Sequence, residues 1–570
     1  MADRLYWTKA LSQEFWAGVV TPLMFSIAGG LIEERMAGKG LRIAGLKHLE
    51  KQPFLKLLGG RVYLNSGILE EVVKRIPSVL VTPEVLRFLP ETTREDLSRR
   101  RVSLFSPRTL RILFRVVFCE KDWAPFSNYK AFDRAARRIE QDGKRYARLR
   151  LEGLSDSDLL DRSRKLYGQM GDFLEVVIWG MVFAYVARPL TDRLAMDWGG
   201  DSEGERAACL RVGLDGIKTF EINREIEILA EEVAGDPWLN ECFDSSDPET
   251  ILARLRREEE GAGFLMRFHS FLEKYGHRFL GRDIRHPTWR ERPETVVDMI
   301  GMNRGSDLCR KTLERQKQKR VEAEREVKGR VNRGVLGLPK RALFSLVLSY
   351  DRRYFVLREN MRYLADIYLE QFRRLYWEMG RRWQSEGILQ GAEEIVFLRR
   401  EEIEEAQKRR TDVSCRVAER KREYELAQGV RTPEVIREGE DPYIAFTQCE
   451  EKKIEIKGEV ASSGHVTGRA RVVREPMDLQ GFQKGEILVA RATDPSWAPV
   501  LPLAAGLVLE VGGLLSHGSI VAREYGIPAL IQAEGALGSL RDGDRLELDT
   551  DRKCVRVCPR PLCPRRPLSP

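Results

Sequence analysis

Apolar residues recur at helical spacing along most of the first three quarters of the chain. From about Asp156 to Gln428, long charged segments carry apolar residues three and four positions apart, which is the repeat of one helix face. The clearest stripe ends at Gly380 and consists of Leu357, Met361, Leu364, Tyr368, Phe372, Leu375 and Met379. This pattern predicts a bundle of long helices, one of which is bounded by Gly380.

The first 150 residues show a mixed pattern instead. Proline and glycine punctuate "VVTPLMFSIAGG" near the start, and Leu57–Gly67 reads as a turn followed by a strand. The longest apolar run, Val176 to Ala187, is too short to cross a bilayer and predicts a buried helix. The opening residues have no apolar segment typical of a signal peptide, so we expect no membrane association.

The pattern changes between Thr432 and Pro442, where the chain becomes polar and proline-punctuated. Short β-like runs separated by glycines follow: "KIEIKGEVA", "GRARVVRE", "GEILVARA", "GLVLEV", "IPALIQ" and "DRLELD". Two helices fit between these runs, one from Pro495 to about Ala504 and one from Gly518 to Tyr525. The sequence therefore predicts a large, mainly α-helical domain followed by a small α/β domain.

We accordingly divide the chain into four parts. Residues 1–435 form the helical domain, residues 436–456 a linker, residues 457–558 the α/β domain, and residues 559–570 a proline- and arginine-rich tail. A chain of 570 residues is too long for one core, which agrees with this division.

Composition narrows the function classes. The net charge of +9 arises from 96 basic and 87 acidic residues, too mild an imbalance to indicate nucleic-acid binding. The nine cysteines are scattered, which favours a reducing cytoplasm. Cys554, Cys558 and Cys563 cluster, but their spacing fits no common zinc pattern, so we predict no metal site.

One of only six histidines, His517, lies in "GGLLSHGSIVAREYGIPAL" between a strand and a predicted helix. The N-terminus of a helix attracts anions through its unpaired N–H groups, and neutral imidazole is a good nucleophile toward a phosphoryl group. Ser516 is a candidate helix cap, and Gly518 gives unobstructed access to the first-turn N–H groups. His517 is therefore a candidate phosphoryl acceptor, with a polar helix cap as the alternative.

Two further residues are candidates for holding the phosphoryl group. Thr493 lies at the other strand-to-helix junction of the α/β domain and offers a hydroxyl. Arg523 supplies a cation, but it lies one and a half helical turns after His517, so a surface salt bridge is the alternative for it.

The stretch around His517 resembles the phosphohistidine motif of the mobile domain in phosphoenolpyruvate-utilising enzymes. Paired glycines, Ser516-His517, Ala522-Arg523-Glu524 and Gly526-Ile527-Pro528 fall in the order of that family, after "GHVTGRARVV" and "ATDPSWAPVLPLAAG". The resemblance covers about Lys457 to Val557 and implies a swivelling β/β/α domain. It also implies that His517 is transiently phosphorylated while the domain moves between a donor site and an acceptor site.

A looser resemblance runs from Trp7 to about Ile403. "FLEKYGHRFLGRDIRHPTWRERP" and "LRENMRYLADIYLEQFRRLYWEMGRRWQSEGIL" are similar to the helical substrate-binding domain of rifampicin phosphotransferase-like proteins. The resemblance makes His277 and Arg278 candidates for binding the acceptor, because adjacent imidazole and guanidinium groups on a helix orient a hydroxyl and a phosphate. A polar helix end is the alternative. Asp283 is a weaker candidate, because the family pattern is interrupted at Gly281-Arg282.

The 570 residues carry no recognisable nucleotide-binding loop, whereas enzymes of this family have an N-terminal ATP-grasp domain. We therefore expect no cofactor in this chain itself, with Mg-ATP bound by a separate ATP-grasp partner. Phosphoenolpyruvate or another phosphohistidine protein as donor, or lost catalysis, are the alternatives. The predicted function is phosphotransfer to a small-molecule acceptor, and the competing class is a non-catalytic interaction or regulatory protein.

Overall fold

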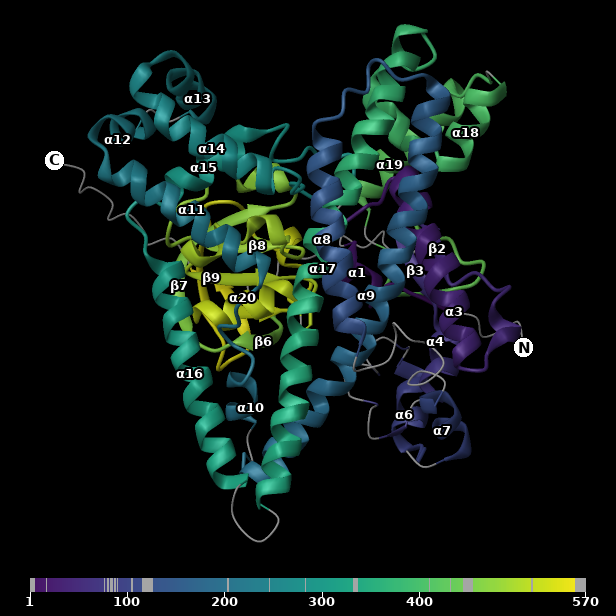
Figure 1. Cartoon of the computed structure of the whole chain (residues 1–570), viewed down its shortest axis with the longest axis vertical. Coiled ribbons are helices and arrows are strands. Elements are labelled where there is room, and N and C mark those ends of the chain that lie inside the picture. Colours follow the sequence, from purple (N-terminus) through teal and green to yellow (C-terminus); the bar gives the residue numbers. More distant parts are fainter. Residues whose placement is uncertain are drawn as a thin grey trace, which may run out of the picture. The chain divides into compact units, whose positions relative to one another are not determined.

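The computed structural model describes residues 6–16, 18–75, 77–78, 81, 86, 89, 91–103, 106–114, 127–201, 204–244, 247–281, 283–331, 337–409, 411–430, 432–443, 455–513 and 516–558. The described chain forms two compact units (Figure 1). Unit 1 comprises residues 1–222, 266–293 and 313–447, and unit 2 comprises residues 223–265, 294–312 and 448–570. Each unit is made of several separate segments of the chain, whereas the domains predicted from the sequence are contiguous. The predicted boundaries at residues 435, 456 and 558 therefore stay a prediction.

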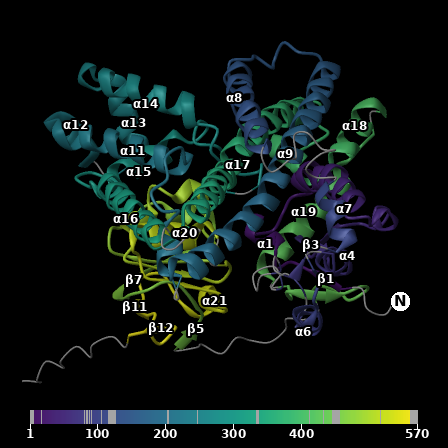
Figure 2. The same ribbon diagram turned by 60° about the horizontal axis from the view of Figure 1, so that its bottom comes forward.

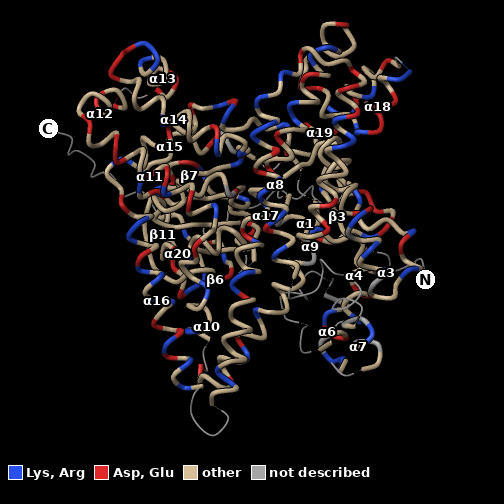
Figure 3. The backbone as a smooth tube through the Cα atoms, in the orientation of Figure 1, with Lys and Arg blue, Asp and Glu red and all other residues tan. Residues whose placement is uncertain are grey.

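Unit 1 is built around two very long helices, α9 (Asp156–Gly199) and α17 (Gly337–Ser385), which pack along each other with α8 (Asn128–Ala147) beside them (Figure 2). Further helices of unit 1 include α18 (Arg400–Arg409), α19 (Ser414–Gly429) and most of α16 (Leu308–Val331). Acidic and basic residues are interspersed along these helices (Figure 3), as at Glu324 and Lys328, which pair one turn apart. The predicted helical bundle is therefore confirmed.

The apolar stripe on α17 is buried as predicted, but the predicted end at Gly380 is wrong. Leu357, Phe372 and Met379 are almost fully buried, yet the helix continues five residues beyond Gly380. A Cβ atom on Gly380 would lie 2.2 Å from the carbonyl oxygen of Ala392 in the short 3-10 helix η9 (Ala392–Phe397). Gly380 therefore allows η9 to pack closely against α17, and it does not end the helix.

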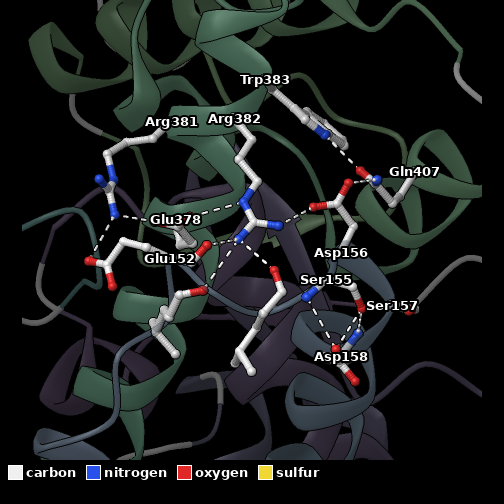
Figure 4. A network of polar contacts seen from close by, with 12 residues as sticks. Glu152, Ser155, Asp156, Ser157, Asp158, Glu378, Arg381, Arg382, Trp383 and Gln407 are labelled. Atoms are coloured by element: carbon white, nitrogen blue, oxygen red, sulfur yellow. Dashed lines mark hydrogen bonds and ion pairs between the residues drawn. The ribbon is translucent and has the colours of Figure 1, made fainter.

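Polar contacts fix where α9 begins (Figure 4). Ser155 accepts from the backbone N–H of Asp158, and the Asp158 carboxylate accepts from the backbone N–H of Ser155, which is a capping box. Arg382 of α17 donates to Asp156 at 2.6 Å and to Glu378 at 2.9 Å. The start of α9 is thereby tied to the end of α17.

Three N-terminal strands and one strand from residues 435–437 form a four-stranded sheet of unit 1 in the order β2-β3-β1-β4. Strands β2 (Leu55–Leu58) and β3 (Arg61–Asn65) form a hairpin at the predicted turn-and-strand segment. Strand β1 (Tyr6–Thr8) pairs with β4 (Val435–Arg437). The first residues of the predicted linker thus belong to a sheet, and residues 444–454 of it lie outside the described chain.

Helix α9 also contains the longest apolar run. It is long and apolar enough to cross a membrane by length and composition alone, and 38% of its apolar window is buried within the protein. Val177 and Phe183 are buried, whereas Val182 is 42% exposed. The predicted helix is present and partly buried, while the absence of membrane association stays a prediction.

The helices of unit 2 include most of α11 (Lys218–Gly235), α12 (Pro237–Asp244), α13 (Pro248–Arg257), α15 (Pro293–Met302) and the start of α16. Glu227 on α11 accepts from the backbone N–H groups of Cys309 and Arg310 at 2.9 and 3.1 Å. This carboxylate caps the first turn of α16 and fixes that helix against α11.

The rest of unit 2 is an eight-stranded sheet in the order β5-β12-β11-β7-β8-β9-β10-β6. Its strands are β5 (Glu455–Lys457), β6 (Glu459–Ser462), β7 (His465–Val473), β8 (Ile487–Ala490), β9 (Gly506–Leu509), β10 (Ala529–Ile531), β11 (Arg545–Asp549) and β12 (Cys554–Val557). All six predicted runs contain strands, and β12 was not predicted. Helix α20 (His517–Tyr525) lies where the sequence placed it.

The two edges of this sheet are joined. Strands β5 and β6 stand at opposite ends of the strand order, yet only Gly458 separates them along the chain. Neighbouring strands lie about 4.8 Å apart, so a flat sheet of eight strands could not bring its edges together across one residue. The sheet therefore curls round on itself, around a core that includes Ile456, Val489 and Leu548.

The predicted helix from Pro495 to Ala504 is wrong. This segment forms two separate 3-10 turns, η12 (Pro495–Trp497) and η13 (Leu501–Leu503). Pro499 and Pro502 have no backbone N–H to donate to an α-helical ladder, which explains the interruption. The fold class is nonetheless confirmed: a large helical part precedes a small sheet domain with helices.

The cysteine cluster shows no metal site among its described members. Cys554 is buried on β12, Cys558 is half-buried, and Cys563 lies outside the described residues. No group of three or more metal-binding side chains occurs in the described part of the chain. All six described cysteines are free thiols.

Candidate functional site

His517 is the first residue of α20, and the residues before it form a tight loop after β9. Gly512 adopts φ +150°, a value that favours glycine, and a Cβ atom there would lie 3.0 Å from Ser516 Oγ. Ser519 Oγ donates to the carbonyl of Gly513 at 2.7 Å and fixes the loop against the helix. Leu514 and Leu515 lie outside the described residues.

Ser516 occupies the cap position, but the predicted side-chain cap is absent. Its φ and ψ of −66° and 157° are those of a helix-capping residue. Its hydroxyl instead lies 3.0 Å from Ser519 Oγ. The hydroxyl is therefore engaged by a second serine, and it does not cap a first-turn N–H.

Thr493 and Gly518 lie side by side, as the sequence suggested for the two strand-to-helix junctions. A Cβ atom on Gly518 would lie 2.8 Å from Thr493 Oγ1 and 2.7 Å from Leu509 Cδ1. Thr493 itself is buried. The absence of a side chain at Gly518 thus allows a buried hydroxyl to approach the first turn of the helix that carries His517.

The His517 side chain is half-buried at this helix start. The first N–H groups of a helix have no intrahelical acceptors, and together with the helix dipole they favour negative charge. Arg523 is also half-buried, and its Nη1 donates to the carbonyl of Ala461 at 3.4 Å. The geometry joins His517, Ser516, Gly518 and Thr493, while the contact described for Arg523 is to β6.

His277 and Arg278 lie in unit 1, in a turn just beyond α14 (Ala262–Tyr275), not on a helix as expected. The His277 ring meets Tyr363 edge-on at 4.7 Å and is 4% exposed. Its Nε2 has no hydrogen-bond partner, and the ring bonds the backbone of Tyr363 through its other nitrogen. Burial, with Arg278 and Arg290 nearby, lowers the pKa of His277 well below its usual value.

A row of charged pairs extends from this turn along α17. Arg278 and Asp366 are 2.6 Å apart and both almost fully buried. Arg362 also approaches Asp366, at 2.9 Å. Two further pairs, Arg290–Glu370 and Arg373–Glu291, continue the row at 2.9 Å each. The row joins the turn after α14 to one face of α17.

Sequence reasoning missed Asp366 and Glu370. Both are buried carboxylates, one turn apart on the same helix as the apolar stripe. An acidic side chain on the buried face of a helix needs a charged partner. The two carboxylates next to the apolar stripe could therefore have indicated buried ion pairs. Asp283, the weaker candidate, accepts from the backbone N–H of Thr21 at 2.7 Å and from its hydroxyl at 2.9 Å. The Asp283 carboxylate therefore fixes the position of Thr21.

Comparison with known proteins agrees with this geometry. Residues 482–553, which include His517 and Thr493, match the family described as PEP-utilising enzyme, mobile domain. The sheet domain of unit 2 is similar to such a mobile domain, and it is called the mobile domain from here on. Residues 176–359, which include His277 and Arg278, match the rifampicin phosphotransferase fourth domain. Both matches confirm the resemblance inferred from the motifs.

Curated relatives also include phosphotransferases. Rifampicin phosphotransferase of Streptomyces sviceus is 30% identical over 63% of this chain and 42% of its own length. An uncharacterized phosphotransferase, YvkC of Bacillus subtilis, is 28% identical over 60% of this chain and 42% of its own length. The prodigiosin synthesizing transferase PigC of Serratia marcescens is 25% identical over 97% of this chain and 63% of its own length. The chain is related to phosphotransferases, and it spans about two fifths of the first two relatives.

Proposed function

We propose that this chain is a phosphotransferase component in which His517 carries a phosphoryl group from a donor to a small-molecule acceptor held by the helical part. The observation that supports this most directly is His517 at the start of α20, in a matched mobile domain, with Gly518 open to the buried hydroxyl of Thr493. A helix start and a hydroxyl are groups that accommodate phosphoryl oxygens.

In the first step, a ring nitrogen of His517 attacks the phosphorus of the donor. A P–N bond forms as the P–O bond to the leaving group breaks, and the leaving group keeps the electron pair. Ser516, Gly518, Thr493 and Arg523 are the residues proposed to hold the phosphoryl oxygens. Such transfer depends mainly on positioning and on neutralising the charge spread over those oxygens.

In the second step, an acceptor hydroxyl attacks the same phosphorus. An O–P bond forms, the P–N bond breaks, and the electron pair returns to the imidazole. The hydroxyl proton passes to the departing imidazole of His517. His277 and Arg278 are proposed to orient the acceptor, and the low pKa of the buried His277 ring keeps it neutral during the step. Arg278 supplies positive charge beside it.

The donor in this proposal is Mg-ATP bound by an ATP-grasp component outside these 570 residues, with magnesium travelling with the nucleotide. Phosphoenolpyruvate is the second donor to test. A cytoplasmic location is part of the same proposal, since the six described cysteines are free thiols and both nucleotide and phosphoenolpyruvate are cytoplasmic metabolites.

The test is labelling of the full chain. The protein is incubated with a candidate ATP-grasp protein and ATP labelled at both the β and γ phosphates, or with labelled phosphoenolpyruvate alone. We expect acid-labile label on His517 and its loss in His517→Ala. His465→Ala is the matched control, because His465 is an exposed histidine on β7 of the same domain, paired with Glu547.

Label that persists in His517→Ala would overturn the assignment of the phosphoryl acceptor. Label from phosphoenolpyruvate without the ATP-grasp protein would replace the donor part of the proposal. Discharge of the labelled chain into a small-molecule extract, followed by mass spectrometry, would identify the acceptor. Slower discharge in His277→Gln, with unchanged charging, is the expected sign of its role in the second step.

A further inference from the structure

The outer face of the mobile domain carries two arginines directly opposite each other on neighbouring strands. Strands β7 and β11 lie side by side (Figure 2), and Arg469 and Arg545 are register partners in this antiparallel pair. Their neighbours Ala470 and Leu546 belong to the core, so both arginines lie on the opposite face, where they are exposed. Like charges at directly opposite positions destabilise a sheet.

No described carboxylate compensates this pair. Among the described residues, neither guanidinium forms an ion pair. Glu547, the first acid along β11, is bonded to His465 at 3.0 Å. The turn before β11 holds two more acids, and both accept backbone N–H groups, at 3.0 and 2.9 Å. By contrast, the next arginine on that face of β7, Arg471, is paired with Glu486 at 3.2 Å.

A third cation lies close to the pair. Lys484 is exposed and likewise forms no ion pair within the described part of the chain. It precedes Gly485, whose carbonyl oxygen would lie 2.9 Å from a Cβ atom on Gly468. Gly468 is the residue before Arg469, so Lys484 adds positive charge on this side of the pair.

The positive charge is nevertheless local. The described residues end at Cys558, whose N–H donates to the carbonyl of Arg545 at 2.7 Å. Residues 559–570 contain three arginines and no acidic residue, whereas residues 455–558 contain 12 basic and 14 acidic residues. A domain without overall positive charge does not attract the long phosphate backbone of a nucleic acid, so a short acidic segment fits this face better.

We propose that Arg469 and Arg545 form a docking site for an acidic segment of a partner protein. A guanidinium group binds a carboxylate through two parallel N–H donors, so two opposed arginines take two carboxylates. A flat, exposed face holds a single free ion only weakly. An acidic segment supplies several carboxylates on one backbone, and its binding offsets the repulsion between the two arginines.

The docking site is separate from His517. Strands β7, β8 and β9 run parallel. Arg469 precedes Ala470, which pairs with Ile487, the first residue of β8, whereas His517 follows the C-terminal end of β9. The two sites therefore lie at opposite ends of the parallel strands, and occupation of the arginine pair requires no contact with His517.

The first test is modification of the full chain by phenylglyoxal, read at each arginine by peptide mass spectrometry. The probe is a hexaglutamate peptide. We expect this peptide to slow modification of Arg469 and Arg545 together. Arg325 on α16 is the internal control, because it is exposed and has no ion pair in the described chain, and its rate should not change.

The second test measures binding of fluorescein-labelled hexaglutamate by anisotropy. Arg469→Gln and Arg545→Gln should each weaken binding about threefold, the scale of an exposed ion pair. Arg552→Gln is the matched control, because it removes the same charge from the same domain at a residue 3.6 Å from Asp549. Both docking-site variants should melt no lower than the parent chain, because each removes one of two opposed like charges.

Unchanged modification of the pair in the presence of hexaglutamate would overturn the proposal. Equal slowing at Arg325, or equal weakening in Arg552→Gln, would also overturn it, because overall charge would then explain the result. Equal protection by inorganic phosphate or by a single-stranded oligonucleotide, at matched ionic strength, would overturn the assignment to a protein segment. These measurements use no phosphoryl donor, so their outcome is independent of the proposed phosphotransfer.

Discussion

At the scale of single residues, the candidate phosphate site depends on what Gly518 lacks. Its missing side chain lets Thr493 and Leu509 come close to the first turn of α20. The sequence predicted His517, Gly518 and Thr493 as one group because both strand-to-helix junctions carry small or hydroxyl residues. It could not predict that the Ser516 hydroxyl would bond Ser519, since that depends on side-chain orientation within the loop.

Gly518→Ala should therefore damage the site. The new methyl group would lie 2.8 Å from Thr493 Oγ1, and overpacking of this kind costs about 1–3 kcal/mol. We expect a lower melting temperature by differential scanning fluorimetry and weaker labelling of His517. Gly235→Ala in the same unit, where no atom lies within 4 Å, should change stability by less than about 1 kcal/mol. Equal effects of the two changes would contradict the steric argument.

His277 should make the protein sensitive to mild acid. Its folded pKa lies well below the ordinary value of 6.5, so below pH 6.5 the unfolded chain binds a proton that the folded chain does not. Stability is then lost as the pH falls, by up to about 1.4 kcal/mol for each pH unit. Urea unfolding between pH 7 and pH 5 should show this loss, and His277→Gln should reduce the slope.

His465→Gln, which removes an exposed histidine from the other unit, serves as the control for that slope. A slope unaffected by His277→Gln would mean that the buried ring accepts a proton in the folded state. The sequence pointed to His277 and Arg278, but it gave no indication of their burial. That burial arises from Tyr363 and Asp366 on α17, about ninety residues away along the chain.

At the scale of elements, periodicity located the long helices but not their ends. The stripe on α17 predicted the buried face correctly, whereas glycine was interpreted as a stop signal. Gly380 is instead a contact point for η9, which no local pattern reveals. The same limit applies to Pro495–Ala504, where the helix-start signal was genuine but two internal prolines prevented an α-helix from propagating.

Two glycines in helices of unit 1 should consequently respond in opposite directions to alanine. Gly380→Ala places a methyl group 2.2 Å from the carbonyl of Ala392 and should destabilise the protein by at least about 1–3 kcal/mol. Gly329→Ala on α16, with no atom within 4 Å, should stabilise it by up to about 1 kcal/mol. Thermal unfolding of both variants measures the difference, and the same sign for both would contradict the packing account.

At the scale of the whole molecule, the chain passes between the two units five times, at residues 222/223, 265/266, 293/294, 312/313 and 447/448. The change in hydrophobic pattern along the sequence indicated only the last of these crossings. At the other four crossings, the helices on both sides have the same amphipathic pattern. The mobile domain nonetheless has a hydrophobic core built from its own residues, including Ala470, Ile487 and Leu546.

Residues 455–558 should therefore fold as an isolated fragment. Just over a hundred residues suffice for an independent core, and every residue of this core lies within the fragment. We expect a cooperative thermal transition by circular dichroism. Leu548→Ala, which empties part of that core, should destabilise the fragment by about 2–5 kcal/mol. A fragment that melts without a cooperative transition would show that the helices of unit 2 are required.

The closure of the sheet through Gly458 has a consequence for the solubility of the sheet domain. An open sheet offers its outermost strands as templates on which other chains can add, and this is a common route to aggregation. Here the two outermost strands are neighbours in the chain, and Gly458 donates its N–H to the carbonyl of Lys553. The sheet domain thus exposes little strand edge on which another chain could add.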